Sequence, residues 1–151
     1  MSQVNWQWYQ FDQLDTDLLY RVLKLRQDVF ILEQQCLYLD LDGKDQDSSH
    51  LIGTLDGEVV AYLRVLSKDI NQQTTMVIGR VLTHASQRGT GAGKTLLQKT
   101  LDYLADHYPD LPVQLSAQLY LQRFYESFGF AAISEPYDED GIMHIDMHLM
   151  V

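Results

Sequence analysis

Apolar and polar positions change their spacing about every dozen residues along this chain. Residues 6–11 alternate as a half-buried strand does. The block over residues 18–30 instead carries apolar residues at the spacing of one helix face: Leu18, Val22, Leu25 and Val29. A polar stretch over residues 40–49, rich in Asp, Gly and Ser, predicts a loop. Helical blocks that alternate with strand-like blocks are typical of an α/β fold.

The same reading continues to the end of the chain. Asp56-Gly57 between two apolar runs predicts a β-hairpin over residues 51–63. Further strands are predicted over residues 76–82, 113–117 and 145–149, and further helices from the glycine-rich segment to Tyr108 and over residues 119–128. Together these elements predict a mixed sheet of six to seven strands flanked by about four helices, in one domain covering residues 1–151.

The glycine-rich segment Arg88–Thr95 is the most informative part of the chain. Three alternating glycines lie between a predicted strand and a long amphipathic helix. Glycine reaches positive φ and lets a ligand approach the main chain closely. The free amides of the first helical turn then favour anionic oxygens. The segment therefore predicts a phosphate-binding cradle.

Spacing separates three kinds of glycine loop. A nucleotide-hydrolase P-loop needs G-x-x-x-x-G-K-[ST]; Gly93-Lys94-Thr95 fits its end, but Arg88 stands where the first glycine belongs. The dinucleotide motif G-x-G-x-x-G fails because Leu96 takes the place of the third glycine. The third pattern, R-x-x-G-x-G, is met by Arg88, Gly91 and Gly93. It resembles the pyrophosphate loop of the GNAT superfamily of N-acyltransferases, which bind acyl-coenzyme A.

A second motif strengthens this resemblance. The segment Phe124-Tyr125-Glu126-Ser127-Phe128-Gly129-Phe130 is similar to the F/L-Y-x-x-x-G-F end of the last helix in the superfamily. The two motifs and the elements around them cover residues 77–130. Residues before and after this stretch, among them Arg26, Cys36, Asp42 and the Tyr137–His144 ending, resemble the ElaA-like branch of the superfamily.

The resemblance implies a binding mode for acetyl-CoA as cosubstrate. Two parallel strands splay apart, and the pantetheine arm pairs with the exposed backbone of Val81, Leu82 and Thr83. The pyrophosphate lies in a cradle formed by Arg88, Gly89, Thr90, Gly91, Ala92, Gly93 and Lys94. Gln118 stands where many relatives have an asparagine that helps hold the pantetheine or a water.

The resemblance also implies direct attack of an amine on the thioester. Tyr125 would face the sulfur and donate a proton to the departing thiolate, since a phenol of pKa about 10 is protonated at neutral pH. The other reading of Tyr125 is a core side chain stacked on Leu121 and Phe128. Many relatives carry a glutamate as base on the strand before the loop, where this chain has Arg80. The base stays open among Glu33, His50, His84, Ser116 with a bound water, and His144.

The acceptor pocket and its alternatives are equally open. Carboxylates could meet a cationic amine there, and the candidates are Glu33, Asp42, Asp45, Asp140 and His144, with His50 and Ser116 nearby. Asp42 and Asp45 could instead cap turns. A metal site of Asp40, Asp42, Asp45 and His50 lacks the EF-hand spacing, so no metal is expected. Cys36 could be a nucleophile, but a lone cysteine is commonly a small buried side chain.

The composition of the chain limits which kinds of partner are expected. The net charge of −10 argues against a nucleic-acid backbone as partner, and it would favour a cationic amine or simply keep the protein in solution. No apolar run approaches the ~20 residues of a membrane span, and the N-terminal residues lack the pattern of a signal peptide, so we expect a cytoplasmic protein with no membrane partner. The alternating final strand could pair across a homodimer or be an ordinary strand of one sheet.

Two other functions fit parts of the sequence. A non-catalytic module that binds acyl-CoA as a sensor or partner subunit would explain the absence of a glutamate base. A nucleotide-binding protein would depend on Gly93-Lys94-Thr95 and would need the lysine side chain. An acyltransferase that relies mainly on backbone amides would tolerate loss of Lys94.

Overall fold

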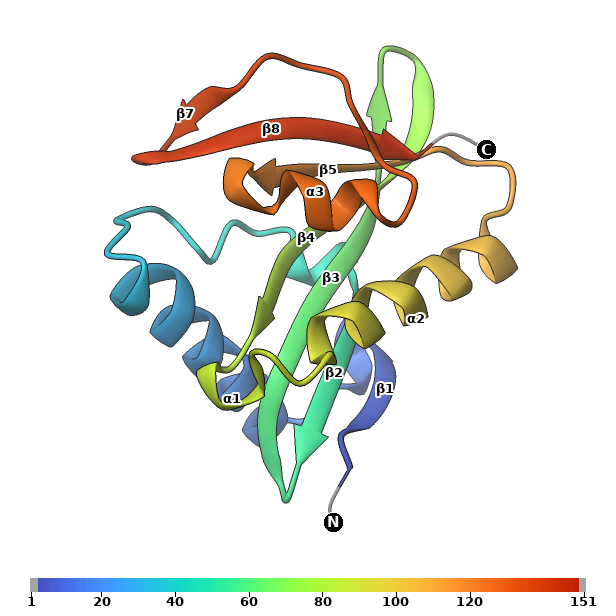
Figure 1. Ribbon diagram of the computed structural model, residues 1–151. Coiled ribbons are helices and arrows are strands. Elements are labelled where there is room, and N and C mark those ends of the chain that lie inside the picture. The colour runs from blue at the N-terminus through green and yellow to red at the C-terminus, as the bar shows by residue number, and fades with distance from the viewer. Residues whose placement is uncertain (1–2, 150–151) are drawn as a thin grey trace.

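In the computed structural model, residues 3–149 are described, and they form an eight-stranded sheet (Figure 1). The strand order is β1-β2-β3-β4-β5-β8-β6, and β7 also pairs with β8. The strands are β1 (Asn5–Gln10), β2 (Ser49–Leu55), β3 (Glu58–Ile70), β4 (Gln73–Thr83), β5 (Val113–Gln118), β6 (Ala131–Ala132), β7 (Tyr137–Glu139) and β8 (Ile142–Leu149). All pairs are antiparallel except β4 with β5.

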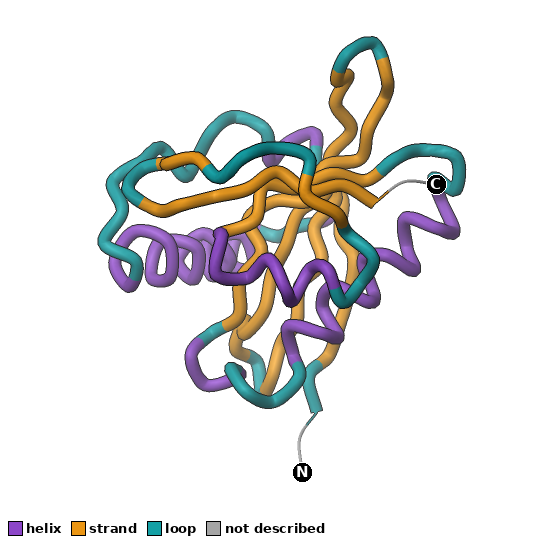
Figure 2. Tube along the Cα trace, turned by 45° about the horizontal axis from the view of Figure 1, so that its top comes forward, coloured by secondary structure: helices purple, strands orange, loops and turns teal. Residues whose placement is uncertain are grey.

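The helices flank this sheet on both sides (Figure 2). They are α1 (Thr16–Arg26), α2 (Ala92–His107) and the short α3 (Gln122–Glu126). Asp15 caps α1 by accepting a hydrogen bond from the Leu18 amide at 2.7 Å, which satisfies one of the free amides of the first turn. A π-helix over Gln27–Glu33 continues α1.

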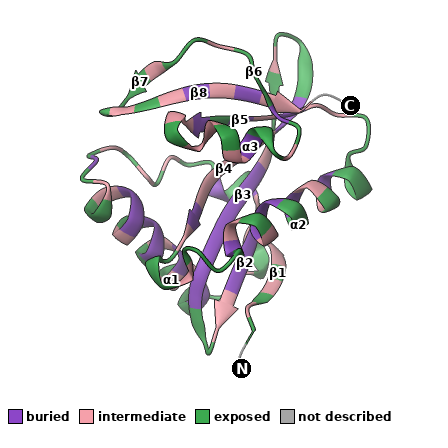
Figure 3. Cartoon of the chain, in the orientation of Figure 1, coloured by how far each residue is buried: buried purple, intermediate pink, exposed green. Residues whose placement is uncertain are grey.

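Two hydrophobic clusters lie on opposite faces of the sheet, because neighbouring residues of a strand point to opposite faces. Leu51, with Leu96 and Leu97 of α2, belongs to one cluster. Ile52, with Val22 of α1, belongs to the other. The buried residues accordingly run along β3 and along the side of α1 that faces the sheet (Figure 3).

Two tight turns organise the antiparallel half of the sheet. Asp56 and Gly57 both have positive φ, of 51° and 81°, which is the conformation of a type I′ hairpin turn. The hairpin predicted there is confirmed. A second hairpin turn at Asn71 and Gln72 was not predicted, and it lengthens β3 and β4 into an arm that projects beyond the other strands (Figure 1).

The mixed α/β class is confirmed, with small differences in number. Residues 3–149 contain eight strands rather than six to seven, because β6 and β7 were missed, and three α-helices rather than about four. The final strand β8 lies between β5 on one side and β6 with β7 on the other, so it is an ordinary strand of this sheet. No helix within this range combines the length and apolar character needed to cross a membrane.

Candidate functional site

The parallel strands β4 and β5 diverge in the middle of the sheet. They pair only from Met76 with Val113 to Ile78 with Leu115. At the same place the pairing of β3 with β4 shifts, so that β4 carries an extra residue between Gly79 and Leu82. Arg80 lies in this bulge with a φ of 53°. The bulge turns β4 away from β5 and leaves the edge of residues 79–83 without a strand partner on that side.

A cleft of about 970 Å³ opens at this divergence. Leu115 lies in the core cluster that includes Tyr125, so Ser116, the next residue of β5, points to the opposite face of the sheet. Both Tyr125 and Ser116 nevertheless line the cleft. The cleft therefore passes through the sheet and is open to groups from both faces, which is what a reaction between two substrates needs.

The glycine-rich segment lies at one end of the cleft. Gly89 and Gly91 have φ of 81° and 87°, and a Cβ added at either would meet no protein atom within 4 Å. Their conformation favours glycine, and the space beside them is open to a ligand. The helical hydrogen bonds begin with the Thr95 amide, which donates to the Gly91 carbonyl at 3.1 Å. The preceding first-turn amides have no acceptor within the helix, so this geometry fits a diphosphate.

About half of the residues predicted to bind the cosubstrate line the cleft itself. Six of the eleven line it: Val81, Leu82, Thr83, Arg88, Gly93 and Gln118. Gly89, Thr90, Gly91, Ala92 and Lys94 continue the loop beyond its wall. The Gln118 amide nitrogen donates to the Gln34 side chain at 3.2 Å, which links β5 to the end of the π-helix.

The Arg88 side chain is hydrogen-bonded to other residues of the protein. Its two terminal nitrogens lie 2.6 Å from the two carboxylate oxygens of Glu33, and one of them also donates to the Thr83 carbonyl at 3.1 Å. The hydrogen bonds from Arg88 hold the pKa of Glu33 below its usual value. Glu33 is thereby a poor candidate for a general base, and its carboxylate holds the Arg88 side chain beside the glycine-rich segment.

Tyr125 lies on α3 with only 4% of its surface exposed, and it lines the cleft. Burial raises the pKa of its hydroxyl to about 12. The hydroxyl makes no hydrogen bond to another side chain or backbone group within residues 3–149. A phenol that stays protonated and keeps its proton available has the properties of a general acid.

The other predicted acceptor and base residues are divided between the cleft and the core. Ser116 and His144 line the cleft. His84 is exposed and binds Ser86. His50 is 1% exposed and lies outside the cleft, where it binds the Tyr62 hydroxyl at 2.6 Å and the Asp45 carbonyl at 2.9 Å. Burial lowers the pKa of His50, so its ring is a neutral part of the core.

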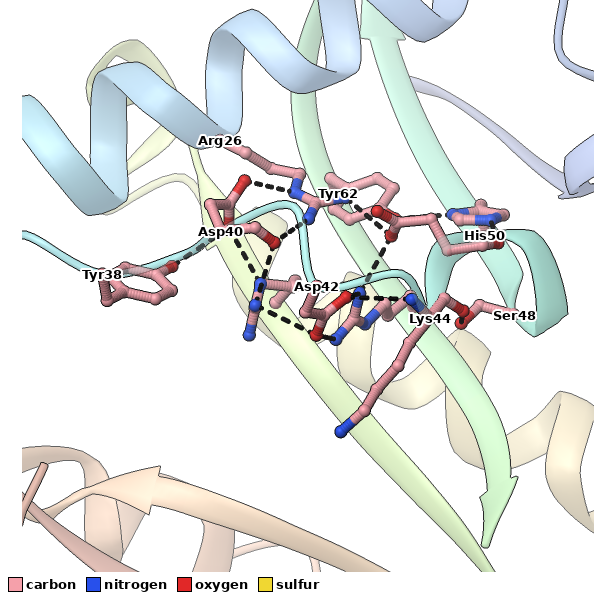
Figure 4. A network of polar contacts seen from close by, with 11 residues as sticks. Arg26, Tyr38, Asp40, Asp42, Lys44, Ser48, His50 and Tyr62 are labelled. Atoms are coloured by element: carbon pink, nitrogen blue, oxygen red, sulfur yellow. Dashed lines mark hydrogen bonds and ion pairs between the residues drawn. The ribbon is translucent and has the colours of Figure 1, made fainter.

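A network of three arginines and three aspartates holds the segment over residues 38–48 against the sheet (Figure 4). Arg26 is 1% exposed and pairs with Asp40 at 3.0 Å and with Asp45 at 2.8 Å. Arg64 pairs with Asp45 at 2.9 Å and with Asp42. Arg80 pairs with Asp40 and Asp42 at 2.8 and 3.2 Å. Three positive and three negative charges cancel within this network.

The network includes two of the carboxylates that were predicted to line the acceptor pocket. Asp42 and Asp45 are bound to arginines, and Asp42 also accepts the Lys44 amide in a turn, as its alternative reading predicted. Asp40, Asp42 and Asp45 of the hypothetical metal site belong to this network, and His50 contacts the Asp45 carbonyl. Within residues 3–149, no group of three or more His, Cys, Asp and Glu side chains is arranged so that it could hold a metal ion. Lys44, by contrast, extends its ammonium away from the network and lines the cleft (Figure 4).

Cys36 is a buried wall residue of the cleft. Its thiol donates to the Asp140 carbonyl at 2.9 Å. Burial raises the pKa of the thiol, and the nearby charge of Asp140 adds to the effect. A thiol held protonated is a weak nucleophile.

The sequence analysis did not predict several of the residues that line the cleft. Arg64, Leu66 and Lys68 line the cleft from β3, which the hairpin prediction ended at Leu63. Their alternation with Val65 and Ser67 was the available signal, because residues two apart on a strand share a face.

Comparisons with known proteins agree with this geometry. The family model described as an acetyltransferase (GNAT) domain matches residues 23–151. Protein ElaA of Escherichia coli K12 is 44% identical over 146 residues, which cover 95% of each chain. The E. coli ElaA crystal structure has a TM-score of 0.91 at 43% identity, covering 97% of this chain and 99% of that one. An acyl-CoA N-acyltransferase from Pseudomonas aeruginosa has a TM-score of 0.89 at 38% identity, with the same coverage.

We predict that Asp45→Asn destabilises the protein by roughly 3–5 kcal/mol at pH 7, because it leaves the charges of Arg26 and Arg64 without their shared partner. Urea unfolding measures the change. Asp47→Asn is the matched control, since Asp47 is exposed in the same 3-10 helix, Asp45–Asp47, and should change the free energy of unfolding by no more than about 0.5 kcal/mol. Equal stabilities of the two variants would contradict the prediction.

The same pair of proteins should converge in acid. Burial alone would raise the pKa of Asp45, but hydrogen bonds from Arg26 and Arg64 outweigh it and the pKa is lowered. A lowered carboxyl pKa contributes stability above the unfolded value of about 3.9, and this stability is lost as the pH falls through the folded value. The difference between wild type and Asp45→Asn should therefore shrink below about pH 4.

Proposed function

Because this chain belongs to the GNAT acetyltransferase family, we propose that it transfers an acetyl group from acetyl-CoA to an amine, by direct attack of the amine on the thioester. Family membership supports acyl-CoA-dependent N-acyltransferase activity. The choice of acetyl as the acyl group, the single-step mechanism and the roles given below to individual residues are our proposal.

The observation that carries the proposal is the unpaired edge of β4 beside the glycine cradle. The pantetheine arm contains two amides, so it can take the place of the missing strand by pairing with Val81, Leu82 and Thr83. The diphosphate would then reach the first-turn amides of α2 with Arg88 beside them. This arrangement leaves the thioester in the part of the cleft that Tyr125 lines.

Acyl transfer to an amine needs two proton movements, and the cleft offers a group for the second. The nitrogen must lose a proton as it becomes an amide, and the departing sulfur gains one. Tyr125 would donate the latter proton, because burial keeps its hydroxyl protonated at neutral pH. A backbone amide of β4 would stabilise the negative charge that develops on the carbonyl oxygen.

The acceptor would enter from the face of the sheet opposite α3. Ser116, His144 and Asp140 line that half of the cleft, and Lys44, Arg64 and Lys68 line its other wall. We propose a small-molecule or peptide amine as the acceptor, since an open cleft of this size admits either.

We expect Gly91→Glu to abolish binding of acetyl-CoA, because it places bulk and negative charge in the cradle. The readout is thermal stabilisation by acetyl-CoA, which for wild type at ~100 times the Kd amounts to about 2.7 kcal/mol. Gly91→Ala controls for the strain of a side chain at positive φ, and it should retain most of the stabilisation.

The same assay distinguishes the nucleotide-binding alternative. Lys94→Ala should keep most of the response to acetyl-CoA, because backbone amides provide the main contacts. Stabilisation of the wild type by Mg-ATP and not by acetyl-CoA would reject the proposal.

Tyr125→Phe should lower kcat by roughly 10²–10⁴-fold, which is the usual contribution of a general acid, and leave the affinity for acetyl-CoA unchanged. Release of CoA thiol in the presence of a primary amine measures the rate. Tyr108→Phe, a tyrosine after α2 outside the cleft, is the control. A Tyr125→Phe enzyme with wild-type kcat would remove the acid from the mechanism, and wild-type turnover of any amine would reject a purely sensory module.

A further inference from the structure

Three side chains from β5, β7 and β8 form a chain of short hydrogen bonds that ends in the cleft. The Ser116 and Tyr137 hydroxyl oxygens are 2.6 Å apart, and the Tyr137 hydroxyl donates to an Asp146 carboxylate oxygen at 2.6 Å. Ser116 and Asp146 are directly opposite each other in the pairing of β5 with β8. Tyr137, the first residue of β7, bridges them.

The direction of these hydrogen bonds follows from the chemistry of the last member. An ionised carboxylate only accepts, so the Tyr137 proton points to Asp146. The Tyr137 oxygen can then only accept from Ser116, and the Ser116 proton points to Tyr137. Burial, supported by the hydrogen bond to Asp146, raises the pKa of Tyr137 to about 12, which keeps its proton in place. Ser116 therefore presents lone pairs of Oγ, and no proton, to the cleft.

Other polar groups in this half of the cleft are engaged differently. His144 Nδ1 lies 2.8 Å from the Ile142 carbonyl, which only accepts, so this nitrogen carries a proton. His144 Nε2 lies 3.4 Å from a Glu139 carboxylate oxygen. The Cys36 thiol donates to Asp140. Ser116 is thus the hydroxyl that is set up as an acceptor, with a negative charge behind it.

We propose that Ser116 accepts a hydrogen bond from the acceptor amine and removes its proton, with Tyr137 and Asp146 as the positioning residues of a proton relay. The inference depends on the proposed acetyl transfer. As the nitrogen bonds to the carbonyl carbon, one N–H bond breaks and its proton goes to Ser116 Oγ. The Ser116 proton passes to Tyr137, and the Tyr137 proton passes to Asp146. The C–S bond breaks, the sulfur takes the Tyr125 proton, and the Tyr125 phenolate then regains a proton from water in the open cleft.

The proposed relay supplies the general base that β4 lacks, because this chain has no glutamate at the position where many relatives carry one. Arg80 stands at that position and is bound to Asp40 and Asp42. Asp146 is half-buried, so it can return its proton to water after each turnover. The substrate class that follows is a primary amine whose nitrogen reaches Ser116 from the face opposite Tyr125.

The first test uses binding and needs no turnover. Protein labelled with [ζ-¹³C]tyrosine is saturated with CoA, and spermidine, L-lysine and benzylamine are added singly as probe amines. The Tyr137 signal is assigned with Tyr137→Phe. We expect at least one probe to shift this signal in wild type and in Ser116→Thr, which keeps the hydroxyl, and not in Ser116→Ala. No shift with any probe, or a shift that persists in Ser116→Ala, would overturn the relay.

The second test uses turnover of whichever probe wild type acetylates. Ser116→Ala and Tyr137→Phe should each lower kcat by about 100-fold or more, with Ser116→Thr restoring most of it and the affinity for CoA unchanged. Ser67→Ala, an exposed serine of β3 outside the cleft, is the matched control. Full turnover in Ser116→Ala rejects the relay and keeps the acyltransferase, whereas a Tyr137 shift without acetylation of any probe rejects the acyltransferase and keeps the amine site.

Discussion

Beyond Ile78 and Leu115, β4 and β5 stop exchanging hydrogen bonds, and the backbone groups along that edge of β4 are left for another partner. Inside a sheet such groups are costly to leave unpaired. The bulge at Arg80 produces the divergence, and its φ of 53° carries strain of order 1–3 kcal/mol. Arg80 is held in place by its ion pairs with Asp40 and Asp42. The cleft therefore depends on contacts between a loop and a single strained residue.

The arginine and aspartate network also explains why the net negative charge of the chain does not give the cleft a cluster of free carboxylates. The three aspartates of residues 40–45 are neutralised by Arg26, Arg64 and Arg80. Buried ion pairs of this kind often add little net stability compared with apolar side chains, but they demand one geometry. Here that geometry joins the end of α1, the loop and the middle of β3 and β4. The network is better understood as setting the shape of the acceptor side than as binding the acceptor.

Much of the fold could be predicted because local signals and tertiary structure agree. The Asp56-Gly57 turn needs only the residues that form it, and Gly89 and Gly91 of the cradle report a backbone conformation that other residues rarely adopt. The second hairpin, at Asn71 and Gln72, has no glycine, so its two positive φ values are imposed by the long pairing of β3 with β4. The π-helix after Arg26 is likewise invisible to apolar spacing, because its residues continue the same buried face.

The site was only partly predictable for a related reason. Motifs indicated the proposed cosubstrate half, since Arg88, Gly91, Gly93 and Tyr125 lie in two short segments of the sequence. The acceptor half is built from residues far apart in the chain, whose roles are decided by their neighbours. His50 has the chemistry of a base, and only the packing of Asp45 and Tyr62 around it shows that it is a core residue.

The alternation of side chains along β5 gives the chemistry its spatial order. Leu115 and Ala117 pack with Tyr125 on one face, so Ser116 between them must face the other. The proposed proton donor, Tyr125, and the proposed proton acceptor, Ser116, thus lie on opposite sides of one sheet, which keeps Tyr125 from hydrogen-bonding to the proposed relay. The two can meet only through the gap that the divergence of β4 and β5 opens. A substrate pair bound in that gap would receive a proton on the sulfur side and lose one on the nitrogen side, which is the direction that acyl transfer to an amine requires.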